Sequence, residues 1–278
     1  MTIDEIILNA LLEDIGDGDH TSLACISQGA TGKAKLLVKQ EGIIAGVKLA
    51  KKVFLTVDKN IVFDEFIHDG VKVKQGDIVF FVSGSSQSLL KAERLVLNFM
   101  QRMSGIATAT NQFVEMIAGL KTKILDTRKT TPNLRVLEKW AVELGGGVNH
   151  RMGLYDMIMI KDNHIDFAGG IQKAIKLTHD YLKKSNKQLK IEIEARSIED
   201  VKQILLMGGV DRIMLDNFNL QDTKEAVKLI NHKYETEASG GITKDTVRKI
   251  AETGVDFISV GALTHHINSL DLSLKAVL

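Results

Sequence analysis

The chain has little of several things, and each absence narrows what it can be. Its 278 residues include one cysteine, Cys25, so no internal disulfide can form and a reducing compartment is expected. There is one proline, Pro132, and no low-complexity stretch that would mark a linker. No apolar run is long enough to span a bilayer, and the start, MTIDEIILNALLEDIG, has acids where a signal peptide would have lysines. Together these absences predict a cytoplasmic protein.

An excess of charge is also missing. The 36 Lys and Arg residues against 35 Asp and Glu give a net charge of +1, so no global field draws the chain to nucleic acid or to a membrane. Cations gather locally instead, in residues 126–165. Arg128 and Lys129 follow the apolar segment KILD, and Lys161 follows MIMI. Charge directly after a buried strand indicates a strand end, where α/β proteins build their sites. Several cations there imply a small ligand with several negative charges.

From residue 121 onward an apolar strand repeatedly ends in a polar residue and is followed by a helical stretch. Six such units in series predict a parallel (β/α) barrel, TIM-like and either closed or open on one side. A doubly wound open sheet is the alternative, which is disfavoured because no G-x-G-x-x-G follows a first strand. The six strands are KILD, MIMI, LKIEIEA, RIMLD, YETEAS and DFISVG.

Residues 1–105 have a different pattern. Segments such as AKLLVKQEGIIAGVK alternate apolar and polar residues between glycine turns, which is typical of antiparallel strands. An apolar stripe predicts a helix over 88–103, with Arg102 at its end. We therefore expect an N-terminal α+β sandwich domain over 1–105 and a barrel over 106–265. A C-terminal helix over about 266–278 is expected to pack back on the first domain.

Glycines follow the last two predicted strands, as Ser239-Gly240-Gly241 and as Gly261. Loops at these two positions of a barrel often bind phosphate through backbone N–H groups. Either loop alone would be interpreted as an ordinary strand-to-helix turn. Two such loops on consecutive final strands favour a phosphate site.

Two acids stand at the ends of neighbouring strands, Glu194 and Asp216. Such a pair can hold Mg²⁺ or sugar hydroxyls, and phosphate loops nearby favour Mg²⁺ on a diphosphate. Asp216 alone would be taken as the cap of a turn. Alternation places Glu192 on the same face as Glu194, so periodicity does not choose between them.

The cations Arg128, Arg151 and Lys161 could clamp carboxylates or phosphates. His150, beside Arg151, could donate a hydrogen bond to a carboxylate, although a lone histidine is as often structural. No Ser/His/Asp or Cys/His pairing and no zinc-ligand spacing is present, so a covalent nucleophile is not indicated. The acids in EDIGDGDHT lack the spacing of a calcium loop and are interpreted as a helix-ending turn.

Several motifs resemble one family along nearly the whole chain. DTRKTTP, GGGVNHRMGLYD, IKDNHI, MLDNF, EASGGI and SVGALTH occur in the order found in the quinolinate phosphoribosyltransferases, a type II phosphoribosyltransferase family. EDIGDGDHT near the start and LNFMQRMSGIAT before the barrel match as well. The resemblance implies transfer of phosphoribosyl from phosphoribosyl diphosphate to quinolinate, with decarboxylation to nicotinate mononucleotide, for NAD synthesis.

The resemblance also implies roles for individual residues. Catalysis would rest on Lys161, Glu194 and Asp216, with Mg²⁺ held by the two acids. Arg102 would come from the neighbouring subunit, which implies a homodimer with shared active sites, or a hexamer as a trimer of such dimers. The substrate-binding set would be Arg102, Thr127, Arg128, Lys129, His150, Arg151, Lys161, Glu194, Asp216, Ser239, Gly240, Gly241 and Gly261.

Two other interpretations stay open at this point. A paralogous phosphoribosyltransferase of the same fold, of the type found with molybdate transport genes, could use another pyridine acid, in which case quinolinate would not be turned over. A non-catalytic nucleotide sensor could keep the pocket, but the full set of acids and cations argues against it. Neither nucleic acid nor a membrane is expected as a partner.

Overall fold

The computed structural model describes residues 1–277, which divide into two compact units. Of the described residues, the first unit comprises 1–111, 130–146 and 262–277, and the second comprises 112–129 and 147–261. The chain first passes from the first unit to the second after residue 111, which is close to the boundary expected near residue 105. Residues 130–146, which were assigned to the barrel, belong to the first unit instead.

The first unit contains a four-stranded antiparallel sheet in the order β12-β1-β5-β3. In β1 the side chains of Ala34, Leu36 and Val38 are buried while alternate residues are not, so one face of the sheet is apolar. The rings of Phe54, Phe63 and Phe80 pack together in this core. A separate two-stranded pair joins β2 to β4. The strands are β1 (Thr31–Val38), β2 (Gly42–Ile43), β3 (Val62–Glu65), β4 (Lys72–Val73), β5 (Ile78–Ser85) and β12 (Leu272–Ala276).

The main helix of the first unit, α4, is longer than the sequence predicted. It runs from Ser86 to Met116, so Arg102 lies inside it. Gly105 does not end the helix. A Cβ there would collide with the backbone of Asn268, so this glycine permits close packing of two segments. The other helices of the unit are α1 (Ile3–Ile15), α2 (His20–Cys25), α3 (Val47–Val57), α5 (Arg135–Leu144) and α11 (Ala262–His265). The EDIGDGDHT segment forms the turn between α1 and α2, as expected.

The C-terminal segment is a strand, and the predicted helix over 266–278 is wrong. Strand β12 pairs antiparallel with β1, with Leu272 opposite Val38 and Leu274 opposite Leu36. The physical reason is the period of its apolar residues. Leu270, Leu272 and Leu274 are buried at every second position, which suits a strand and not a helix. Through its pairing with β1 the segment belongs to the first unit.

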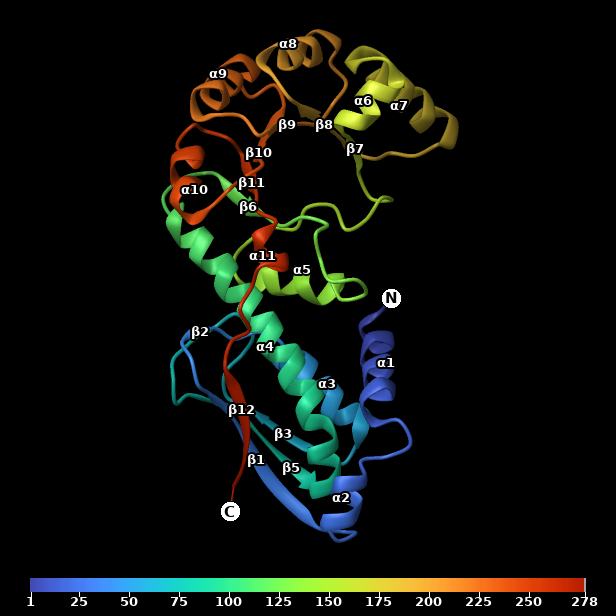
Figure 1. The fold of residues 1–278 in the computed structure, drawn as a ribbon, viewed down its shortest axis with the longest axis vertical. Coiled ribbons are helices and arrows are strands. Elements are labelled where there is room, and N and C mark those ends of the chain that lie inside the picture. The colour runs from blue at the N-terminus through green and yellow to red at the C-terminus, as the bar shows by residue number, and fades with distance from the viewer. Residues whose placement is uncertain (278) are drawn as a thin grey trace. The chain divides into compact units, whose positions relative to one another are not determined.

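The second unit is built on a parallel sheet of six strands in the order β6-β11-β10-β9-β8-β7. All six predicted strands are present. In Figure 1 they curve around a common interior, with helices α6 to α10 on the outside. Strands β6 and β7 are the two edges, so the barrel is open between them. The strands are β6 (Lys123–Leu125), β7 (Ile158–Ile160), β8 (Ile191–Ala195), β9 (Arg212–Asp216), β10 (Glu235–Ser239) and β11 (Phe257–Ser259).

The helices of this unit pack one apolar face on the sheet. In α8 the buried residues Val201 and Ile204 lie one turn apart, and the N-cap Ser197 accepts a hydrogen bond from the Asp200 backbone. Within residues 1–277 no helix has both the length and the apolar character needed to cross a membrane. The helices are α6 (Asp162–Ala168), α7 (Ile171–Ser185), α8 (Ile198–Met207), α9 (Leu220–Ile230) and α10 (Lys244–Ala251).

Candidate active site

Most of the predicted site residues lie at one edge of the six-stranded sheet. Because the strands are parallel, their carboxyl ends meet there. We call these ends, with the loops that follow them, the mouth. It carries Thr127, Arg128 and Lys129 after β6, Lys161 after β7, Glu194 on β8, Asp216 at the end of β9, Ser239, Gly240 and Gly241 at and after β10, and Gly261 after β11.

The acids and the lysine of the mouth interact directly. Lys161 Nζ lies 3.0 Å from Glu194 Oε1, and the Asp162 backbone N–H donates to Glu194 Oε2 at 3.2 Å. Lys161 is 46% exposed, so the pair opens to solvent. Burial and the negative charge of Glu194 raise the pKa of Asp216, although a hydrogen bond from Asn217 opposes the rise. Two carboxylates that repel one another in this way are suited to binding a cation between them.

Two guanidinium groups lie close enough to repel one another. Burial, and then the positive charge of Arg128, lower the pKa of Arg151. The Arg151 Nη1 atom donates to the Met157 carbonyl at 3.0 Å. The Nε of Arg128 is buried and has no hydrogen-bond partner among the described residues. A half-buried guanidinium whose N–H groups lack acceptors is suited to binding an anionic ligand, because the anion supplies those acceptors.

The loops after β10 and β6 shape the mouth through their backbone. The loop after β10 has Gly240 at φ 95° and Gly241 at φ 60°, conformations that favour glycine. The Lys129 backbone N–H donates to Thr127 Oγ1 at 3.0 Å, which shapes the turn after β6. Lys129 itself is exposed.

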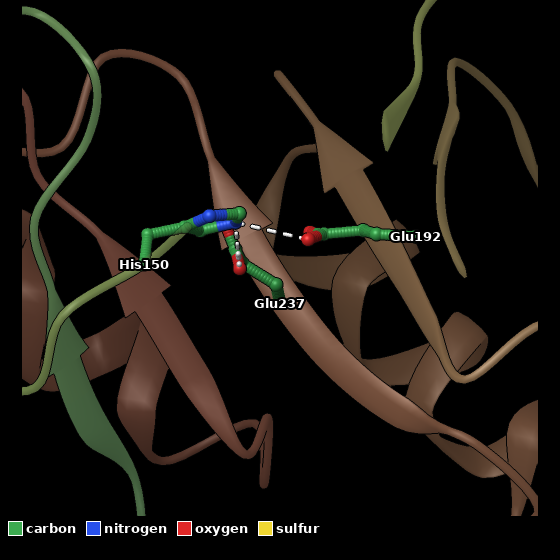
Figure 2. A group of neighbouring side chains, drawn as sticks. All are labelled: His150, Glu192 and Glu237. Atoms are coloured by element: carbon green, nitrogen blue, oxygen red, sulfur yellow. Dashed lines mark ion pairs between the residues drawn. The ribbon is translucent and has the colours of Figure 1, made fainter. Parts of the chain in front are cut away.

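His150 lies deeper in the barrel. Its Nε2 is 2.9 Å from Glu192 Oε2 and 3.3 Å from Glu237 Oε2 (Figure 2). Its backbone N–H donates to Asp126 Oδ1 at 2.8 Å, which ties the loop to the end of β6. The side chain of His150 is 5% exposed and both glutamates are fully buried. The histidine therefore does bond a carboxylate, but one that belongs to the protein.

The protonation of His150 is set by opposing influences. Burial lowers its pKa, but the hydrogen bonds and charges of Glu192 and Glu237 raise it to about 9. The Arg151 backbone N–H donates to Nδ1 at 2.7 Å, which favours a ring without a proton on that atom. Two formal negative charges outweigh one amide dipole, so the raised pKa prevails.

Arg212 completes this group, and we call His150, Glu192, Arg212 and Glu237 the deep cluster. Arg212 Nη1 is 3.1 Å from Glu237 Oε2 and 3.9 Å from Glu192 Oε2. Its guanidinium also lies over the Phe257 ring, 4.0 Å from the centroid. His150, Glu192 and Glu237 have spacing that could hold a metal ion. Arg212 and His150 already supply the positive charge that the two carboxylates need, so a metal ion would have to displace them.

The sequence-based reasoning did not identify Arg212 and Glu237. A signal was available, because both are charged residues at alternate positions of strands that are otherwise buried. The structure also distinguishes Glu192 from Glu194, which the alternation of side chains along the strand could not do. Glu194 faces Lys161 at the mouth, while Glu192 faces His150 below it.

Arg102 belongs to the first unit, and its hydrogen bonds and its ion pair with Glu138 lie within that unit. Its Nη2 is 2.6 Å from Glu138 Oε1 and donates to Thr131 Oγ1 at 2.7 Å. A third bond goes to the Thr264 carbonyl at 3.3 Å. The side chain is 33% exposed, so part of the guanidinium is open to a further partner.

The fold and the mouth define an α/β protein with cations and acids gathered at the ends of its parallel strands. Family sequence models agree and are more specific. The quinolinate phosphoribosyl transferase C-terminal domain matches residues 106–275 and the N-terminal domain matches 19–104. The chain belongs to the quinolinate phosphoribosyltransferase family.

Individual relatives cover almost all of the chain. A tobacco protein named quinolinate phosphoribosyltransferase [decarboxylating] 2b, mitochondrial, is 47% identical over 98% of this chain and 81% of its own length. A probable nicotinate-nucleotide pyrophosphorylase [carboxylating] from Bacillus subtilis is 40% identical over 100% of this chain and 94% of its own. The crystal structure of NadC from Streptococcus pyogenes superimposes with a TM-score of 0.93 at 38% identity, covering 99% of this chain and 97% of that one.

Proposed function

We propose that this enzyme transfers the phosphoribosyl group of phosphoribosyl diphosphate to the nitrogen of quinolinate, and that it releases diphosphate and CO₂ to give nicotinate mononucleotide. Membership of the family supports the proposal. The single observation that carries it is the half-buried pair Arg128 and Arg151, whose positive charges repel one another. Quinolinate has two adjacent carboxylates, and such a ligand would satisfy both guanidinium groups.

The mouth supports a division of roles. Arg128, Arg151 and Lys161, with His150 behind them, bind the quinolinate carboxylates, and Arg102 of a neighbouring subunit contributes a further cation. Thr127 and Lys129 bind the diphosphate or 5′-phosphate region. Glu194 and Asp216 bind the ribose hydroxyls. The 5′-phosphate is held by the backbone of Ser239, Gly240, Gly241 and Gly261.

Mg²⁺ fits the acids of the mouth. Burial, and then the charge of Glu194, raise the pKa of Asp216, and a divalent cation with oxygen ligands would relieve the repulsion between the two acids. Glu194 and Asp216 would hold the ion together with the diphosphate. When bound, Mg²⁺ would neutralise charge on the diphosphate.

The residues present suit a mechanism without a general base. The pyridine nitrogen already has a lone pair, so no proton need be removed before attack on the anomeric carbon of the ribose. Positive charge develops on that carbon as the diphosphate leaves, and the carboxylates of Glu194 and Asp216 stabilise it electrostatically. The ring nitrogen is then positive, so it stabilises the electron pair left on the neighbouring C2 when the 2-carboxylate departs as CO₂, and C2 then takes a proton from water. The cations hold the 3-carboxylate during this step.

Release of labelled CO₂ from carboxyl-labelled quinolinate tests the proposal. We expect release to need both phosphoribosyl diphosphate and Mg²⁺, and to stop on exhaustive chelation. Binding of quinolinate without turnover would favour the sensor. Turnover of another pyridine acid alone would favour the paralogue.

The shared active site of a homodimer rests on Arg102. Mixing Arg102→Ala with Lys161→Ala, each of much reduced activity alone, with subunit exchange confirmed by mass spectrometry, tests it. In a shared-site dimer one site of each heterodimer carries neither lesion, so activity returns to roughly a quarter of wild type at equal amounts. No recovery would contradict sharing. The hexamer and the cytoplasmic location stay predictions, and the tobacco relative is named as mitochondrial.

A further inference from the structure

Asn217 joins two parts of the mouth that the proposed site keeps separate. It follows Asp216 directly and adopts a left-handed conformation with φ 57°. Its Nδ2 donates to Asp216 Oδ2 at 2.9 Å. This amide orientation is the one a carboxylate requires, because an anionic oxygen accepts only from a donor.

The other side of the same amide lies against the loop after β10. A Cβ placed on Gly240 would overlap the Oδ1 and Cγ atoms of Asn217 and lie 3.0 Å from its backbone nitrogen. The Asn217 backbone N–H also donates to the Ser239 carbonyl at 2.8 Å, one residue beyond the paired positions Asp216 and Ser239. The glycine at 240 is thus explained by two requirements, its own φ of 95° and the space that Asn217 occupies.

We infer that Asn217 is a positioning residue that fixes the distance between the Asp216 carboxylate and the Ser239–Gly241 loop. This inference rests on the proposed roles of those two parts, which are ribose hydroxyl and 5′-phosphate binding. A ribose 5-phosphate unit carries its hydroxyls and its phosphate on one short carbon skeleton. The acid and the loop can therefore bind it together only when they stay at one separation.

The left-handed backbone makes a clean substitution possible. Glycine adopts φ 57° without strain, so Asn217→Gly removes the amide and leaves the turn. Asn231 provides the matched control, because it is an exposed asparagine at φ 45° that ends α9 outside the mouth. Asn217→Asp keeps the shape but replaces the donor with a charge that repels Asp216.

Calorimetric titration with ribose 5-phosphate, in the absence of metal, is the direct measurement. We expect Asn217→Gly to weaken binding about tenfold, the loss of one hydrogen bond to a charged group, and Asn231→Gly to leave it unchanged. Asn217→Asp should weaken binding at least as much. In steady-state kinetics the KM for phosphoribosyl diphosphate should rise while the KM for quinolinate stays constant.

Several results would overturn the inference, each in a distinct way. If Asp216→Asn weakens ribose 5-phosphate binding and Asn217→Gly does not, Asn217 has no positioning role. Equal losses for ribose 5-phosphate and quinolinate in Asn217→Gly would reduce its role to general stability. If neither Asp216→Asn nor Asn217→Gly changes binding, the proposed ribose site itself is wrong. If Asn217→Asp binds normally, the residue does not act through its donor.

Discussion

Strands β8, β9 and β10 carry polar side chains at two depths, and the two layers differ in how their charges are balanced. The deep cluster uses Glu192, Arg212 and Glu237 from these strands, and each lies against a group of opposite charge. A few residues further along the same strands stand Glu194, Asp216 and Ser239 of the mouth. There Asp216 has a raised pKa because of burial and of Glu194.

The comparison teaches that burial alone does not identify a binding residue. The deep glutamates are fully buried beside His150 and Arg212, so two cations face two carboxylates, although burial and the charge of Glu237 still raise the pKa of Glu192 to about 7. At the mouth Lys161 pairs with Glu194, but after burial the charge of Arg128 still lowers the pKa of Arg151, and that of Glu194 still raises the pKa of Asp216. We therefore expect the mouth, which opens to solvent, and not the buried deep cluster, to take the charged ligand.

Arg212→Met, in the deep cluster, should cause the largest loss of unfolding free energy. It removes the cation between Glu192 and Glu237, and loss of one partner from a buried pair costs about 3–5 kcal/mol of unfolding free energy. Chemical denaturation measures this. Turnover per folded molecule should stay near wild type, because Arg212 touches no proposed ligand. Lys202→Met on α8 removes an exposed ion pair with Glu199 and should change stability little. A stable Arg212→Met protein would show that the deep charges are not needed for folding.

Lys161→Ala, at the mouth, should lower activity and leave stability almost unchanged. Its ammonium is half exposed beside Glu194, so the unfolding midpoint should hardly move. We expect kcat/KM to fall by roughly tenfold to a hundredfold, as for loss of one charged hydrogen bond. Lys176→Ala, which breaks a surface pair with Asp180, is the matched control and should keep full activity. A large loss of stability with normal kinetics in Lys161→Ala would place this lysine in the structural layer.

A smaller effect concerns the pH dependence of stability. The pKa of His150 is raised to about 9 in the folded chain, from 6.5 when unperturbed. The protonated ring therefore stabilises the fold fully below pH 6.5, and that stabilisation is lost as the pH rises through 9. One proton corresponds to a slope of at most about 1.4 kcal/mol per pH unit. Unfolding free energies measured between pH 6 and 10 should decline more steeply for wild type than for His150→Gln. Parallel curves would mean that the Arg151 N–H keeps the ring neutral.

Much of the fold could be predicted because its signals are local. Each barrel strand is a short apolar run with a polar end, and all six were found. The C-terminal strand was missed because Leu270, Leu272 and Leu274 alternate over a few residues only, and its partner β1 is more than 200 residues away in sequence. The passage of residues 130–146 to the first unit depends on tertiary packing, for which no local pattern exists.

The mouth was predictable for the same reason, since each of its residues follows a recognisable strand. The deep cluster was not, because its partners come from three strands and one loop. Alternation gave Glu192 and Glu194 the same face, but only the pairing of β8 with its neighbours sets one against His150 and the other against Lys161. Arg212 was missed because the role of a single arginine in an apolar strand cannot be inferred until its partners on the neighbouring strands are known.

The central claim is that the unbalanced cations of the mouth bind quinolinate, and Arg151→Ala tests it most directly. Calorimetry should show quinolinate affinity reduced by roughly tenfold to a hundredfold, the loss of one charged hydrogen bond. The affinity for phosphoribosyl diphosphate should stay close to wild type, and Arg248→Ala should change neither. Equal losses for both ligands, or unchanged quinolinate binding, would contradict the account.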